Sequence, residues 1–282
     1  MNKYIFTLLA ILAGIAILFQ SACEKDEIET LPLQTVNGEI LETVDYGTKV
    51  FLFSFKTDLE TYPVTYIIRN ETNVEGNQVN INLIDIQKDG LDDLNIETGS
   101  ASCIIQLGAL DNGTYDLQIT AGNFSGAGQF SITDEQVLFD FPVTDGISIR
   151  HDTLNRIPFG TIWGYVGYQS ISHASIATSF ISNMNAIGAE NAVFEPGYYG
   201  YFSVSDSGNI IQPIDDGFEY YKEFFKTYTG EANAMDEHVN YYMTEYFNKV
   251  DISFYWYYGG ALKSHPVSTA ARKDLNKFSP NM

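Results

Sequence analysis

The densest group of side chains able to hold a ligand is aromatic and lies toward the C-terminus. Twelve of the 19 tyrosines fall between Tyr198 and Tyr258. A Tyr or Trp ring can stack on a sugar or a macrocycle while its hydroxyl or indole N–H bonds to the polar rim. Residues 254–258 place rings on both faces of a strand, so either the strand is central or one face meets a ligand. We expect a ligand site formed by Tyr255, Trp256, Tyr257 and Tyr258, with Tyr198, Tyr199 and Tyr201 as its neighbouring wall.

Acidic residues offer a second, weaker site. Carboxylate oxygens are the ligands that Ca²⁺ prefers, and four of them cluster in the sequence, at Asp85, Asp89, Asp92 and Asp93. The spacing is not that of an EF-hand, and a solvated loop on an acidic protein explains it as well. The four histidines are far apart and none has a second ligand at metal-site spacing. We therefore expect no cofactor and no metal beyond this calcium candidate.

The overall charge excludes one class of partner. The chain carries 15 Lys and Arg against 36 Asp and Glu, which gives a formal net charge of -21 at pH 7. Such a charge repels a phosphate backbone, so we expect no nucleic-acid binding. The sequence also lacks the short motifs of zinc peptidases, serine hydrolases and nucleotide-binding proteins. A hydrolase built from unlinked carboxylates remains open, because such enzymes leave little local motif.

The residues before Cys23 form a distinct segment at the start of the sequence. An apolar run over residues 4–19 precedes it and is shorter than the roughly 20 residues of a membrane span. Ser21 and Ala22 stand directly before the cysteine. This segment resembles a lipobox, the cleavage and acylation site of bacterial lipoproteins. The resemblance implies that residues 1–22 are a signal peptide and that Cys23 carries the lipid, whereas the alternative is an uncleaved anchor helix.

Two further segments resemble features of exported Bacteroidota proteins. Residues 24–27 read Glu-Lys-Asp-Glu and are similar to the acidic signal that sends lipoproteins to the outer face of the outer membrane. The resemblance implies an acidic tether over residues 23–32 and a lipid-anchored protein that faces the exterior. Asp152, Thr153 and Leu154 resemble an O-glycosylation site of the same bacteria, which implies a glycan on Thr153.

The chain after the tether predicts a first domain over residues 33–136. Apolar residues recur there with a period of two, as in Phe51, Phe53 and Phe55 and again over residues 115–121. About seven such strands in roughly 100 residues are typical of an immunoglobulin-like sandwich. We therefore expect an all-β immunoglobulin-like domain.

Residues 111–117 support this expectation. They read Asp-Asn-Gly-Thr-Tyr-Asp-Leu, which resembles the turn that opens strand F of immunoglobulin-type domains, with Leu117 in place of the cysteine. The resemblance implies that Tyr115 is a corner tyrosine, its ring in the core and its hydroxyl bonded to backbone a few residues upstream. The only other cysteine, Cys23, would carry the lipid, so Cys103 has no disulfide partner and is expected to be a small buried hydrophobe.

The remainder, residues 140–282, predicts an α+β domain. Apolar residues with helical spacing indicate helices over residues 172–187, 216–230 and 233–250. Strands are expected over residues 147–150, 161–168 and 252–258, with a hairpin over 198–212. The expected architecture is three helices beside a small antiparallel sheet, and this half resembles no family that we recognise.

These features together favour a non-enzymatic surface lipoprotein. The sandwich would lift the aromatic domain away from the membrane to capture a glycan or another small molecule. This arrangement resembles the glycan-binding lipoproteins that supply TonB-dependent transporters, which implies such a transporter as partner and a role in nutrient uptake. Three alternatives stay open: a haem- or corrinoid-binding protein, a carboxylate-based hydrolase, and an adhesin or assembly subunit.

Overall fold

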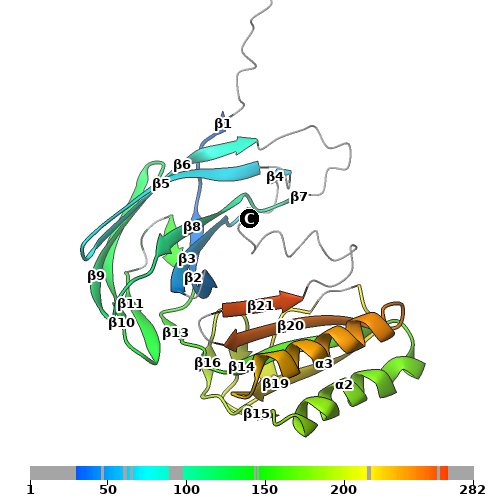
Figure 1. Ribbon diagram of the computed structural model, residues 1–282. Coiled ribbons are helices and arrows are strands. Elements are labelled where there is room, and N and C mark those ends of the chain that lie inside the picture. Colours follow the sequence, from blue (N-terminus) through cyan, green and yellow to red (C-terminus); the bar gives the residue numbers. More distant parts are fainter. Residues whose placement is uncertain are drawn as a thin grey trace, which may run out of the picture.

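The computed structural model describes residues 30–45, 48–59, 62–63, 66–88, 98–142, 144, 146–214, 217–258 and 261–265. It contains two units that follow each other along the chain. The first is a large curled sheet, and the second is a smaller sheet with two helices against it (Figure 1). Cys23 and the acidic residues 24–27 lie outside the described residues.

The first unit is one mixed sheet of eleven strands. The strand order is β12-β2-β3-β8-β5-β6-β9-β10-β11-β13, with β1 beside β6. The strands are β1 (Thr30–Leu31), β2 (Val36–Asp45), β3 (Thr48–Thr57), β5 (Tyr66–Glu75), β6 (Gln78–Lys88), β8 (Ser102–Gly108), β9 (Gly113–Ala121), β10 (Phe124–Ile132), β11 (Gln136–Asp140), β12 (Ile147–Ile149) and β13 (Thr153–Asn155). A separate pair joins β4 (Tyr62–Pro63) to β7 (Thr98–Gly99).

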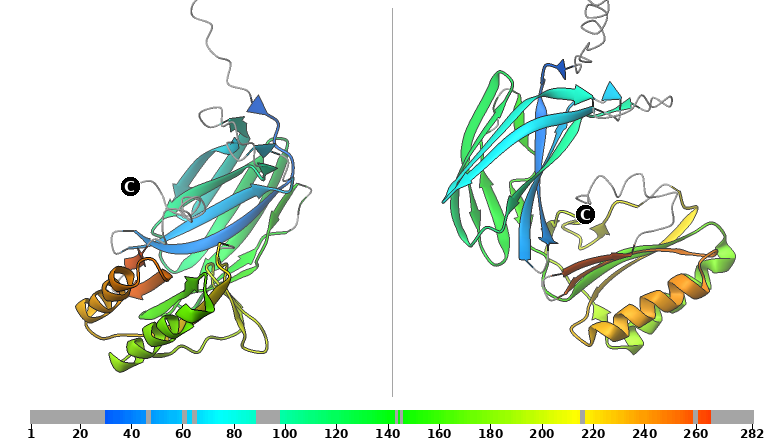
Figure 2. Two further views of the ribbon diagram at one scale, coloured as in Figure 1. Left: turned by 90° about the vertical axis from the view of Figure 1, so that its right-hand side faces the viewer. Right: turned by 45° about the horizontal axis from the view of Figure 1, so that its top comes forward.

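The expected immunoglobulin-like sandwich is wrong. Strand β8 pairs antiparallel with β3 and meets β5 on its other side through one parallel pair, Ile67 with Ser102. The strands therefore form one sheet that curls on itself rather than two separate sheets (Figure 2). Alternation along a strand determines which face is buried, but it does not choose the neighbouring strand.

The curl encloses a single core. Its members are the alternate residues of the predicted strands, among them Phe51, Phe53 and Phe55, which are fully buried. The Tyr115 ring stacks on Phe130 at 5.1 Å between centroids. Its hydroxyl donates to the Asp111 carbonyl at 2.9 Å, so the predicted upstream bond of this tyrosine is confirmed.

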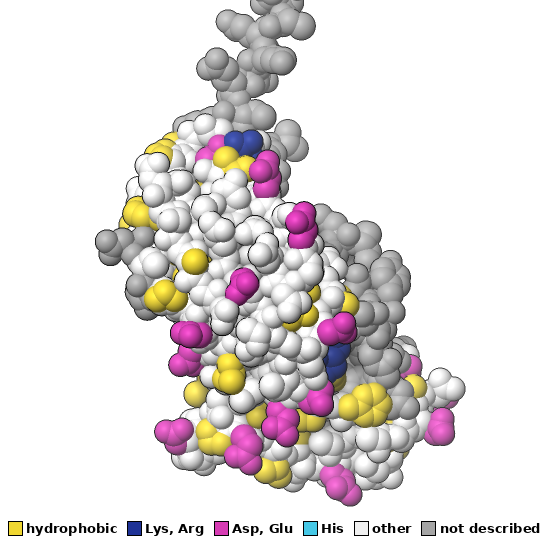
Figure 3. All heavy atoms as spheres, turned by 90° about the vertical axis from the view of Figure 1, so that its left-hand side faces the viewer, with side chains coloured by type: hydrophobic (Ala, Val, Ile, Leu, Met, Phe, Trp, Pro, Cys, Tyr) yellow, Lys and Arg dark blue, Asp and Glu magenta, His cyan; other side chains and the backbone are white. Residues whose placement is uncertain are grey.

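The opposite, outer face of β6, β9 and β10 carries polar side chains. Figure 3 shows the side of the molecule on which these strands lie.

The second unit is a five-stranded sheet in the order β15-β19-β14-β20-β21. Two helices pack on one of its faces (Figure 2), and a small three-stranded sheet, β16-β17-β18, lies against the other. The elements are β14 (Thr161–Tyr168), a 3-10 turn (Ile171–His173), α2 (Ala174–Ala186), β15 (Glu190–Asn191), β16 (Gly197–Tyr198), β17 (Ser203–Val204), β18 (Ile210–Ile211), β19 (Tyr220–Thr227), α3 (Ala232–Glu245), β20 (Asp251–Tyr258) and β21 (Ala261–His265).

The prediction of three helices is also wrong, because the middle one is a strand. The described residues contain two α-helices, α2 and α3, which match the first and third predicted helices. Residues 220–227 form β19, which pairs with β14 along its whole length. Phe218, Tyr221 and Phe225 have helical spacing, but Tyr, Phe and Thr also favour strands. Pairing with β14 makes this segment a strand rather than a helix.

Candidate functional site

The predicted aromatic site does not open to solvent, because β20 is a central strand. It lies between β14 and β21 and has a layer packed on each face. Trp256 is fully buried between the sheet and the helices, with its ring 5.6 Å from that of Tyr228. Tyr257 points to the opposite face and is also buried. The side chain of Tyr258 is outside the described part of the structure.

Two of the three predicted wall residues, Tyr199 and Tyr201, lie on the same face as Tyr255 and Tyr257, but they pack there. Tyr201 lies 6.0 Å from the Tyr255 ring, and Tyr255 stacks on the buried Trp163 at 5.5 Å. Burial raises the pKa of Tyr201 to about 12. Tyr199 stacks on Phe202 at 4.9 Å, and Tyr198 stacks on His151 at 3.8 Å. The rings of Tyr199, Tyr201 and Tyr255 belong to a second core beneath β16-β17-β18 rather than to the lining of an opening, whereas Tyr198 packs against the first unit.

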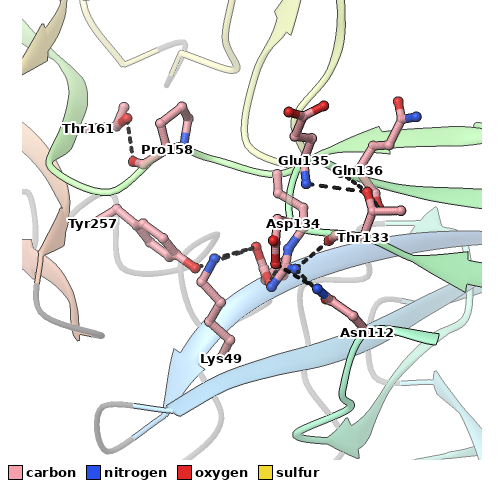
Figure 4. Close-up of polar contacts among 11 residues, drawn as sticks. Lys49, Asn112, Thr133, Asp134, Glu135, Gln136, Pro158, Thr161 and Tyr257 are labelled. Carbon is pink, nitrogen blue, oxygen red and sulfur yellow. Dashed lines mark hydrogen bonds and ion pairs between the residues drawn. The ribbon is translucent and has the colours of Figure 1, made fainter.

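The junction between the two units holds a buried ion pair (Figure 4). Glu42 of β2 accepts from Arg156 Nε at 3.0 Å and from Arg156 Nη2 at 2.6 Å. The Tyr257 hydroxyl of β20 donates to the same carboxylate at 3.4 Å, and Lys49 Nζ is 3.7 Å from it. The side chains of Glu42 and Arg156 are only 4% and 9% exposed. We call Glu42, Arg156, Lys49 and Tyr257 the junction cluster.

The electrostatics of the junction cluster are those of a structural joint. Arg156 also donates to the Thr133 carbonyl at 2.6 Å, so its charge is bonded on two sides. Burial lowers the pKa of Lys49, while burial and the Glu42 carboxylate raise the pKa of Tyr257. Tyr257 is therefore a neutral hydrogen-bond donor at neutral pH. The Glu42 carboxylate is surrounded by the side chains of Arg156, Lys49 and Tyr257. These contacts connect β2 with β20 and with the segment before β14.

An open depression of about 230 Å³ lies at the far end of the second unit. Strand β14 runs antiparallel to β19 and β20, so its last residues meet their first ones. The start of α2 and the end of α3 adjoin the same place, at the right-hand end of the lower sheet in Figure 1. We call it the distal depression, and its lining residues are Gly167, Tyr168, Gln169, His173, Phe218, Phe247, Asn248, Lys249, Val250 and Asp251.

The distal depression combines aromatic and polar groups. Phe247 is 68% exposed, and the Phe218 ring lies so close over Gly167 that a Cβ there would be 2.5 Å from it. Nδ1 of His173 is shielded from solvent and has no hydrogen-bond partner among the residues that the structure describes. A buried polar atom of this kind is normally satisfied by a partner. Exposed rings beside polar groups suit a ligand with one apolar face and a polar rim.

Sequence reasoning missed both phenylalanines of this site. Phe247 lies in the third predicted helix but one position beyond Tyr246, which belongs to the apolar stripe of that helix. A large aromatic residue outside the stripe was the available signal. Phe218 was assigned to a helix that does not exist.

The remaining predicted sites are placed only in part. Asp85 forms an ion pair with Arg69, and Asp89, Asp92 and Asp93 lie outside the described residues. In the part of the chain that the structure describes, no three His, Cys, Asp or Glu side chains come together as a metal site. Thr153 is half-buried at the start of β13. Cys103 is half-buried, and desolvation raises the pKa of its thiol to about 12.

No helix among the described residues is long and apolar enough to cross a membrane. Comparison with known proteins provides no relative: no family model, no curated protein and no solved structure matches this chain.

Proposed function

We propose that this chain is a non-enzymatic, lipid-anchored surface protein that binds a glycan or a similar small polar molecule. In this proposal Cys23 carries the lipid in the outer membrane, the curled sheet spaces the second unit from the bilayer, and the ligand is passed to a TonB-dependent transporter. The alternatives named from the sequence are haem or corrinoid binding, a hydrolase and an adhesin, and no contact described above favours any of them.

One observation carries the proposal. The first described strand, β1, lies at one end of the curled sheet, and the second unit lies at the other end (Figure 1). A lipid placed before β1 would therefore hold the membrane on the side away from the distal depression. The junction cluster supports the same idea, since a bonded joint keeps the second unit in one orientation.

The size and lining of the distal depression favour a sugar ring over a macrocycle. Its volume of about 230 Å³ is below the roughly 300 to 1,000 Å³ of pockets that bury drug-sized ligands. Phe218 and Phe247 offer ring faces, and Gln169, Asn248 and Asp251 offer donors and acceptors around them. This combination replaces the buried tyrosines as the proposed binding site.

Binding should depend on Phe247. We expect Phe247→Ala to weaken retention on the best ligand of a glycan panel by about tenfold or more, as for an aromatic hot spot. The melting temperature should stay unchanged, because the ring is exposed. Tyr241→Ala is the matched control, since Tyr241 is a similarly exposed ring on α3 outside the lining. Equal losses in both variants, or no retention by the parent protein, would contradict the proposed site.

The anchor is tested separately. Labelled palmitate should enter the parent protein in its native host and should not enter Cys23→Ala, because no other residue takes the acyl chains in this proposal. Protease treatment of intact cells should remove the second unit from the parent protein. Equal labelling of both proteins would contradict lipid attachment at Cys23, whatever the outcome of the glycan panel.

A further inference from the structure

We propose that the outer face of β6, β9 and β10 is a second binding surface, and that its ligand is a neutral, hydroxyl-rich chain such as an uncharged polysaccharide. This surface lies on the first unit, away from the distal depression. The proposal does not depend on the function assigned to the distal depression.

The surface is a shallow depression of about 430 Å³ over three adjacent strands. Its lining residues are Gln78, Asn80, Asp116, Leu117, Gln118, Ala127, Gly128 and Gln129. The register aligns their side chains in rows, because Asn80 stands opposite Gln118 and Gln118 stands opposite Ala127. Ala127 contributes only a methyl group, so the longer amide side chains beside it extend further from the sheet. We call this surface the amide face.

The side chains of the amide face match hydroxyl groups. Each Asn or Gln amide offers N–H donors and a carbonyl acceptor, and a sugar hydroxyl both donates and accepts. Gln129 Nε2 already donates to Asp116 Oδ1 at 2.7 Å, which holds both side chains in place. The amides of Asn80 and Gln118 make no side-chain hydrogen bond to any residue that the structure describes. These two amides are therefore available to a ligand.

Charge selects a neutral ligand. The lining residues include no Lys or Arg, and their one charged member is Asp116. The next strand, β5, adds exposed Glu71 and Glu75 on the neighbouring surface. On this side of the molecule uncharged side chains and backbone predominate, with scattered carboxylates and few cations (Figure 3). An anionic chain would be repelled by these carboxylates and by the net charge of -21.

The amide face also differs from the part of the outer surface that the second unit covers. There the outward residues Leu41, Val50 and Leu52 are apolar and pack against Tyr198. On the amide face the outward residues of β9 and β10 are exposed and polar or small. No described element packs over them. A contact with an apolar protein surface therefore suits β2 and β3, whereas the amide face suits a polar chain.

The test uses the full chain with Phe247→Ala, which removes the distal depression from the measurement. The probe is an array of neutral glucans, mannans, xylans and galactans, with polygalacturonate and heparin as anionic members. We expect at least one neutral glycan to be retained, and the added pair Asn80→Ala and Gln118→Ala to lower that retention tenfold or more. The matched control pair is Thr114→Ala on β9 and Ser131→Ala on β10, which lie outside the depression.

Each outcome decides the proposal. Loss of retention in the amide pair but not in the control pair, with unchanged melting temperatures, supports it. If Phe247→Ala alone abolishes all retention, the amide face is overturned while the proposed function of the distal depression stands. Retention that is equal in the amide and control pairs, or confined to anionic chains, also overturns the amide face.

Discussion

Replacing Trp256 by alanine is expected to lower the free energy of unfolding by about 3 to 5 kcal/mol, the range for large aromatic core residues. Trp256 is fully buried among residues of the sheet and the two helices, and its ring lies 5.6 Å from Tyr228. Alanine would remove the indole and leave a cavity that this packed layer can fill only in part. Chemical denaturation followed by the fluorescence of Trp163 measures the change.

The same variant separates a core residue from a ligand contact. If Trp256 stacked on a ligand, its replacement would weaken binding and leave the unfolding midpoint where it was. Tyr241→Ala serves as the control, because Tyr241 is 55% exposed on the outer side of α3. If Trp256→Ala loses no more stability than the control, the core assignment is wrong and Trp256 is a candidate ligand contact.

Changing Glu42 to glutamine is expected to destabilise the protein by about 3 to 5 kcal/mol, the cost of leaving one partner of a buried ion pair unpaired. Glutamine keeps the size and part of the hydrogen bonding of Glu42 but removes its charge. The Arg156 guanidinium, with its side chain 9% exposed, then has no carboxylate at 2.6 Å. Denaturant unfolding at neutral pH gives the free energy of each variant.

A double-variant cycle shows that the loss comes from the uncompensated charge. Glu42→Leu combined with Arg156→Met removes both charges and should recover most of the stability lost by either change alone. Arg69→Ala is the comparison at the surface, where the ion pair with Asp85 is solvated and should contribute far less. Additive losses in the double variant would show that the two side chains of the junction cluster act independently.

Much of the local structure could be predicted from the sequence. The alternation at Phe51, Phe53 and Phe55 correctly identified the buried face of β3. The helices α2 and α3 and the strands β14 and β20 also lie where the periodicity placed them. These elements carry a strong period of their own, and their burial follows it. Residues 220–227 combine helical spacing with residue types that favour strands, so the sequence alone could not separate helix from strand there.

The candidate site could not be predicted in the same way. The sequence showed an excess of rings in residues 254–258 but not what lies against them. Residues 194–212 fold back over the sheet and bury Tyr199, Tyr257 and Trp163 in a second core. Phe247 was left exposed because it sits just beyond the end of α3, outside the packed stripe.

The amino-acid pattern was sufficient for the buried faces of the strands that alternate clearly, such as β3 and β9, for the two helices with a clear apolar stripe, and for the strongly acidic charge. The curling of the first sheet as one piece, the central position of β20 and the burial of Trp256 became visible only in the three-dimensional structure. The reason is physical: side-chain periodicity is a property of one segment, whereas strand neighbours and covering layers depend on contacts between segments far apart in the chain. Whether an aromatic side chain binds a ligand depends on those contacts, because a ring that is covered by another layer cannot meet one.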